Sequence, residues 1–199
     1  MRWFVEDVGI ALTDPRSLIA IARVEKRGLG EALAFVILFS LATILSLSAP
    51  VISLLSTFLP IEVSASAYIL AAAIGVSGGL VLWILDSALM HFISRALGGQ
   101  GALSETATAV GYSYAAMWPI ALAGLASCFT SWLPSLFLIA LGLVLEVAWR
   151  WYVLVNGLSE VHGYSTLRGL LTIILARLVY VALFVAIPLL AASAAAPGW

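Results

Sequence analysis

The chain has 199 residues, of which 63% are hydrophobic and 10% are charged, and its formal net charge is −1. A soluble domain has about 25% charged residues, so this composition indicates a membrane protein instead. The near-neutral charge gives no reason to expect a nucleic-acid partner. The single cysteine, Cys128, excludes an internal disulfide.

Residues 1–31 form an N-terminal segment that carries five of the nine Lys and Arg residues. Residues 1–13 are mixed in character and predict no element. Asp14 followed by Pro15 is typical of a helix N-cap and first turn. Residues 15–27 then separate apolar from basic side chains, and glycines at 28 and 30 end the segment. We therefore expect a short amphipathic helix, separate from the first span, at the membrane interface.

The basic residues of this helix are candidates for contact with lipid headgroups or with a partner protein. They are Arg16, Arg23, Lys26 and Arg27. A simpler interpretation treats them only as a positively charged anchor that fixes the orientation of the chain.

Five apolar runs follow, each long enough for a helix that crosses a bilayer core of about 30 Å. Pro119 predicts a kink in the third run. The predicted spans are residues 32–58, 67–97, 106–131, 135–158 and 166–195. The predicted fold class is therefore all-α: a polytopic membrane helix bundle of five transmembrane helices, with residues 32–199 as its membrane domain.

The distribution of basic residues predicts how the chain is oriented. Lys and Arg are absent from residues 43–67, 119–135 and 178–199. Positive charge is retained on the cytoplasmic side of a membrane. We expect a protein of the cell membrane with a cytoplasmic N-terminus and an extracytoplasmic C-terminus.

Four ionisable residues inside the predicted spans are candidates for a polar network: Asp86, Glu146, Arg150 and Arg177. Charges at membrane depth are costly and usually pair inside a bundle. Glu146 and Arg150 are four residues apart and can pair along one helix. Two acids and two bases balance, which favours a structural clamp over a proton pathway; side chains that reach to the membrane interface are the remaining alternative.

A stripe of small residues on the second span consists of Ala71, Gly75 and Gly79. Small residues at this spacing let two helices approach closely. Packing within one chain is the plainer interpretation, and dimerisation is the alternative.

Catalytic and metal-binding patterns fit the sequence poorly. Glu146-x-x-x-Arg150 resembles part of the Glu-Glu-x-x-x-Arg motif of intramembrane CAAX-type proteases, but position 145 is Leu and the required pair of membrane histidines is missing. His91 and His162 are the only histidines, and their spacing does not predict a zinc site. We expect no enzyme activity, no metal and no cofactor.

Three short motifs resemble the Yip1-domain family of integral membrane proteins. They are Gly-Tyr-Ser at 111–113 followed by Pro119, the segment 157–165, and Asp14-Pro15 ahead of a short helix. Five spans with a cytoplasmic N-terminus agree with this resemblance. It implies a small membrane protein that organises partners or lipids without catalysis.

Two residues of the first motif, Tyr112 and Ser113, carry hydroxyls suited to hydrogen bonding at the cytoplasmic interface. We expect them to contact the interface or a partner. A plain aromatic belt is the alternative.

Two functions remain in competition. The first is a Yip1-type scaffold or adaptor whose partners are membrane lipids, other membrane proteins or further copies of itself. The second is a transporter or permease subunit that uses the charge cluster around a solute route. A transporter often contains inverted repeats, and no such repeat is evident in the sequence.

Overall fold

The structure is a computed structural model that describes residues 2–25, 27–58 and 64–195. Within these ranges the regular structure is entirely helical, with eight α-helices and one 3-10 turn. In chain order the elements are α1 (Arg2–Thr13), α2 (Pro15–Val24), α3 (Leu29–Phe58), α4 (Ala65–Ala96), α5 (Leu103–Tyr112), η1 (Ser113–Met117), α6 (Trp118–Ser127), α7 (Trp132–His162) and α8 (Thr166–Ala195).

Five stretches are long and apolar enough to cross a membrane, so the predicted all-helical fold with five spans is confirmed in length and composition. They are Leu29–Ile52, Ala65–Ala96, Leu103–Ser127, Trp132–His162 and Thr166–Pro188. The helices that contain them begin and end within four residues of the predicted spans.

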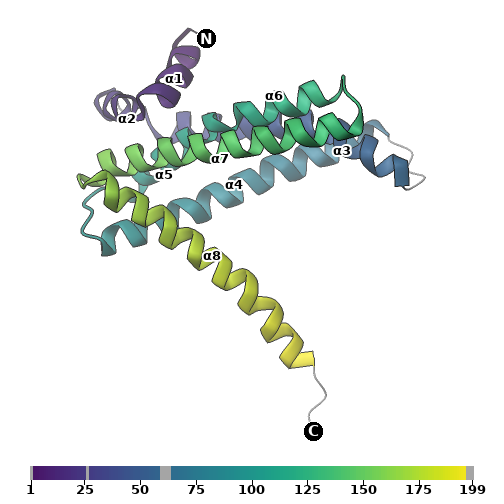
Figure 1. Ribbon diagram of the computed structural model, residues 1–199. Helices are drawn as coiled ribbons and strands as arrows, with labels where there is room; N and C mark the ends of the chain where they lie inside the picture. Colours follow the sequence, from purple (N-terminus) through teal and green to yellow (C-terminus); the bar gives the residue numbers. More distant parts are fainter. Residues whose placement is uncertain (1, 26, 59–63, 196–199) are drawn as a thin grey trace.

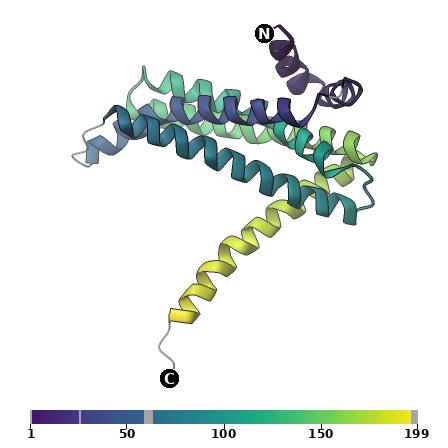
Figure 2. The ribbon, with the colours of Figure 1, turned by 180° about the vertical axis from the view of Figure 1, so that it is seen from behind.

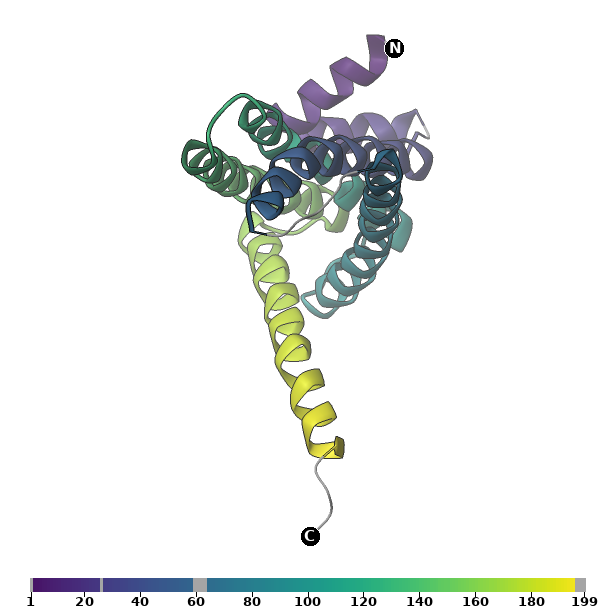
Figure 3. The same ribbon diagram turned by 90° about the vertical axis from the view of Figure 1, so that its right-hand side faces the viewer.

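The fifth span leaves the other four at a wide angle (Figure 1). α3, α4, α6 and α7 run next to one another, whereas α8 starts beside the ends of α4 and α7 and then diverges (Figures 1 and 2). Figure 3 shows α8 projecting away from the remaining helices. The end of the bundle where α8 begins, with the loop 97–102 and the turn 163–165, is called the basic end below.

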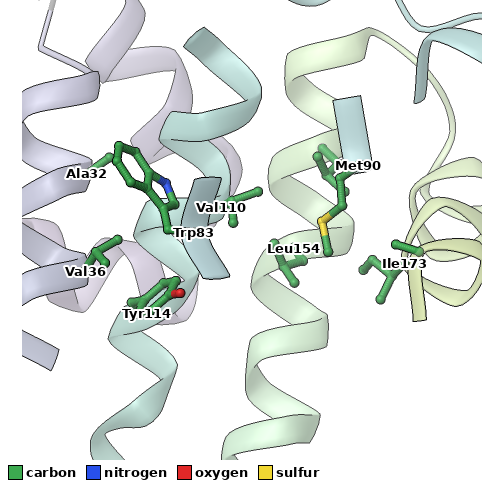
Figure 4. Close-up of a cluster of buried hydrophobic side chains, with 10 residues drawn as sticks. Ala32, Val36, Trp83, Met90, Val110, Tyr114, Leu154 and Ile173 are labelled. Carbon is green, nitrogen blue, oxygen red and sulfur yellow. The ribbon is translucent and has the colours of Figure 1, made fainter. Parts of the chain in front are cut away.

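The core lies at the basic end and centres on the third span. The most apolar 18 residues of that span are 67% buried, against 11–35% for the other four spans. Side chains from α3, α4, α5, α7 and α8 form one buried cluster, part of which Figure 4 shows. Met90, Leu154 and Ile173 meet there, so α4, α7 and α8 are held together at the root of α8.

The α-helical geometry of the third span is interrupted by the 3-10 turn η1, which ends two residues before Pro119. Proline has no backbone N–H and its ring clashes with the carbonyl four residues earlier, so the preceding turn cannot continue as a regular α-helix. At the predicted kink site the structure has a tightened turn over Ser113–Met117.

Small residues on α4 let α3 approach closely. A Cβ added to Gly75 would lie 2.7 Å from the Cβ of Ile44, and one added to Gly79 would lie 2.9 Å from the Cβ of Ser40. Ala71, the third member of the predicted stripe, is half-buried. The two glycines thus serve packing within this chain.

The N-terminal segment contains two helices where the sequence predicts one. α1 occupies residues for which the sequence predicted no element. Phe4, Val8 and Ala11 recur on it at helical spacing and pack against the bundle. α2 is separate from α3 and is capped by Asp14, which accepts hydrogen bonds from the hydroxyl and the backbone N–H of Ser17 at 2.5 and 3.3 Å. These hydrogen bonds hold the pKa of Asp14 below its usual value.

The apolar side of α2 is turned towards the protein. Leu18, Ile19 and Ala22 are buried in one cluster with Phe35 of α3 and Tyr112 of α5. The apolar face of this helix was expected to contact the membrane interface. In the structure that face contacts the bundle instead, which accounts for its amphipathic pattern.

Candidate functional site

The four ionisable residues of the predicted polar network lie together at the basic end, where α8 leaves the bundle. α4 contributes Asp86, α7 contributes Glu146 and Arg150, and α8 contributes Arg177. The four residues are called the charge cluster below.

Asp86 is the centre of the charge cluster. The two terminal nitrogens of Arg177 donate to its two carboxylate oxygens at 3.0 and 3.3 Å. Such a bidentate pair is among the stronger hydrogen-bonded contacts that a carboxylate makes. Arg150 approaches the same carboxylate at 3.6 Å. The Asp86 side chain is only 4% exposed, so it is an internal acid shared by two arginines.

Arg150 connects the two acids. One terminal nitrogen lies 3.6 Å from Glu146 Oε1, and its guanidinium carbon lies 4.6 Å from the centre of the Tyr114 ring. A cation over an aromatic face is stabilised by the ring quadrupole. The Tyr114 hydroxyl donates to the carbonyl of Gly79 at 2.9 Å, which fixes the ring. The sequence did not indicate Tyr114 as a partner of the cluster.

The arrangement is balanced, because each buried carboxylate faces at least one arginine. Paired charges of this kind hold helices in register, whereas a group that carries protons needs an acid without a fixed cation. Within residues 2–25, 27–58 and 64–195, no three His, Cys, Asp or Glu side chains gather in a way that could hold a metal ion.

The basic residues of the N-terminal segment are engaged to different degrees. Arg23 pairs with Glu105 of α5 at 2.8 Å, and Arg16 is exposed on α2. Arg27 contacts three carboxylates, including that of Asp7 on α1 at 2.9 Å. Burial works against the Arg27 cation, but the three acids outweigh it and raise the pKa of Arg27. Lys26 lies outside the described residues.

Tyr112 and Ser113 do not reach the protein surface, although the sequence led us to expect them at an interface. Both are buried. The Tyr112 hydroxyl donates to Glu31 Oε2 at 2.6 Å, and the Ser113 hydroxyl donates to the Val110 carbonyl at 2.6 Å. The central position of the third span explains their burial.

A second polar group links α1, α3 and α5, and sequence reasoning missed it. It consists of Asp7, Arg27, Glu31 and Tyr112. Arg27 and Glu31 are four residues apart, which is a signal for pairing. Asp7 carried no such signal, because residues 1–13 were not predicted to be helical.

The end of α1 is bound to α7 by two aromatic side chains. Trp149 Nε1 donates to the Leu12 carbonyl and the Tyr152 hydroxyl donates to the Thr13 carbonyl, each at 2.9 Å. The last carbonyls of a helix have no partner within it. These two residues therefore cap α1.

The two histidines meet through Thr106. Its hydroxyl lies 3.1 Å from His91 Nδ1 and 3.0 Å from His162 Nε2. His162 Nδ1 accepts from the N–H of Gly101 at 3.2 Å. The histidines thus fasten the loop 97–102 to α4, α5 and α7.

Comparison with protein-family models matches residues 10–187 to the Yip1 domain. The match covers nearly the whole chain, and it includes both motifs of the third and fourth spans on which the resemblance was based. No curated protein and no solved structure gave a match. The apolar helices and this match together show a multi-pass membrane protein, and the chain belongs to the Yip1 domain family.

Proposed function

We propose that this protein is a membrane scaffold or adaptor that organises other membrane proteins, lipids or further copies of itself. We place it in the cell membrane with its N-terminus in the cytoplasm and its C-terminus outside. The observation that carries the proposal is the detached position of α8 (Figure 3).

α8 has two different halves. Near its start, Ile173 and Ala176 are fully buried against the bundle. From Leu178 to Pro188 every side chain except the half-buried Tyr180 is exposed, and Phe184 is 83% exposed. The second half therefore offers its whole circumference to other molecules in the membrane.

Residue types on this half support contact with another helix. Ala182 and Ala186 are four residues apart and both are exposed. Small residues at this spacing allow two backbones to approach closely in a membrane, where close packing replaces the hydrophobic effect as the driving force. Bulky neighbours such as Phe184 supply additional contact area.

The charge cluster supports a structural role in presenting this surface. Arg177 is the last charged residue of α8 before the detached half, and its pair with Asp86 ties the root of α8 to α4. Since the charges are mutually paired, the cluster favours the scaffold over the transporter. Arg16, Arg23 and Arg27 would then lie at the cytoplasmic surface, where Arg16 is free to meet headgroups or a partner.

Photo-crosslinking in the native membrane tests the proposal. A benzophenone amino acid replaces Phe184, and the matched control carries it at Phe137, an exposed phenylalanine of α7. We expect a defined protein adduct from position 184 that the variant Ala182→Leu, Ala186→Leu loses and that position 137 does not give. Adducts with lipid alone at both positions would contradict the proposal. Solute uptake that Asp86→Asn abolishes would instead favour the transporter.

A further inference from the structure

Two adjoining cavities lie at the basic end, where α3 begins beside α4 and α5. The larger has a volume of about 390 Å³ and is lined by apolar residues that include Trp83, Ile84 and Leu103. The smaller has a volume of about 200 Å³ and is lined by Arg23 and Arg27 among others. Leu29 and Ser104 belong to the walls of both cavities, so the two lie side by side.

The larger cavity presents a hydrocarbon surface. Two of its three polar side chains are satisfied within the protein: Trp83 Nε1 donates to the Ala107 carbonyl at 2.8 Å, and the Ser87 hydroxyl donates to the Trp83 carbonyl. Trp83 is almost fully buried, and Figure 4 shows it at the edge of the buried cluster beside Ala32. A ligand of this cavity gains mainly apolar contact.

The cavity opens on the outer face of two membrane-spanning helices. Ile84 of α4 and Leu103 of α5 form its rim, and both are exposed at the surface of the chain. The molecules that meet this face in a membrane are lipids. An acyl chain matches the apolar chemistry of such a cavity.

The smaller cavity has a mixed lining that contains two arginines, Arg23 and Arg27, and one acid, Glu105. The Arg23 side chain is 47% exposed, and its bond to Glu105 uses one of the five N–H donors of a guanidinium. Arg27 pairs with Asp7, Glu25 and Glu31. Arg23 is therefore the arginine of this cavity whose remaining N–H groups can donate to a ligand. Guanidinium groups bind phosphate with two parallel hydrogen bonds.

We infer that the two cavities form a binding site for one phospholipid molecule. One acyl chain lies in the larger, apolar cavity against Trp83, and the headgroup phosphate lies in the smaller cavity against Arg23. The site takes a lipid from the leaflet at the basic end. It is separate from the detached half of α8.

The test measures binding of dioleoylphosphatidylglycerol to the full-length purified protein by native mass spectrometry. Dioleoylglycerol, which lacks the phosphate, is the matched ligand. We expect one tightly held phospholipid per chain and weaker retention of the diacylglycerol. Arg23→Gln should reduce phospholipid affinity by about tenfold and leave the diacylglycerol unchanged. Arg16→Gln, which alters an exposed arginine of the same helix, should change neither.

Two further variants test the apolar half. Ala88→Phe fills the cavity from its wall, and Leu103→Trp covers it from the exposed rim, where the fold is least disturbed. Each should reduce the affinity for both ligands by about tenfold or more. Unchanged binding in Leu103→Trp would overturn the assignment. Equal losses in Arg16→Gln and Arg23→Gln would also overturn it, since they would indicate general attraction to charge.

Discussion

At the scale of single residues, the charge cluster is asymmetric. Asp86 is the acid that both arginines share, whereas Arg177 is 35% exposed and Asp86 keeps Arg150 as a second cation. Removal of the acid leaves two cations without their common partner. Removal of Arg177 leaves a carboxylate that is still paired. Substitution of each of the four residues should therefore lower the free energy of unfolding by a different amount.

Asp86→Leu should lower the free energy of unfolding by about 3–5 kcal/mol, because it leaves buried charge uncompensated. Arg177→Leu should cost less, and the double variant should recover part of the Asp86→Leu loss. Thermal unfolding of the purified protein in detergent measures all three, with the exposed Arg16→Leu as control. Wild-type stability of Asp86→Leu would show that the cluster is not a clamp.

The hydrogen bond between Tyr112 and Glu31 gives a second residue-scale prediction. A buried hydroxyl that donates to a carboxylate at 2.6 Å makes a charge-assisted bond. Tyr112→Phe should therefore destabilise the protein by about 1.5–3 kcal/mol. Tyr68→Phe on α4 is the matched control, because the Tyr68 hydroxyl has no hydrogen-bond partner among the described residues. Equal melting temperatures for the two variants would contradict this account.

At the scale of elements, the N-terminal helices are fastened to the bundle by polar contacts as well as by apolar burial. α1 is held through its last carbonyls and through Asp7, and α2 is held through its buried apolar face and Arg23. Each contact joins one of the two N-terminal helices to a neighbouring part of the chain. Loss of such a contact should open the short helix locally without unfolding the bundle.

Trp149→Phe and Tyr152→Phe should each increase local opening of α1 by about fivefold, which corresponds to one lost hydrogen bond. Hydrogen exchange of residues 2–13 measures this opening. Trp132→Phe, at the exposed start of α7, should have no effect on it. Uniform acceleration over the whole chain in the Trp149 or Tyr152 variants would mean that these bonds stabilise the bundle as a unit.

At the scale of the whole molecule, the spans could be predicted because length, apolar runs and flanking charges define them directly. The arrangement of the spans could not, because apolar residues cover helix faces that meet protein and faces that meet lipid alike. The detached course of α8 depends on contacts such as that of Gly169, where an added Cβ would lie 2.7 Å from the Val155 carbonyl oxygen. A single sequence does not indicate which glycine makes that contact.

Part of the candidate site could also be predicted from the sequence, and part could not. The sequence predicted a network of four residues because their charges balance and because they lie at similar distances from the cytoplasmic ends of their helices. The structure places these residues together: Asp86, Glu146, Arg150 and Arg177. The partners at Tyr114 and Glu31 were not evident, because a tyrosine or an acid near a span end also fits an interfacial role. Burial of Tyr112 followed from the central position of the third span, which no periodicity in the sequence specifies.

The orientation of the whole molecule is the last prediction, and the single native cysteine allows a direct test. Cys128 is exposed and follows α6, at the end of the bundle opposite the basic end. Gln100 is exposed in the loop between α4 and α5, at the basic end. With the basic end in the cytoplasm, as the positive-inside rule requires, the two positions lie on opposite sides of the membrane.

A membrane-impermeant maleimide should therefore label Cys128 in intact cells. The variant Cys128→Ser, Gln100→Cys should be labelled only after the membrane is permeabilised, and Cys128→Ser alone should never be labelled. The reverse pattern would place the basic end outside. It would also place the phospholipid site in the outer leaflet. The residues of that site, and the lipid chemistry that they recognise, would be the same in either orientation.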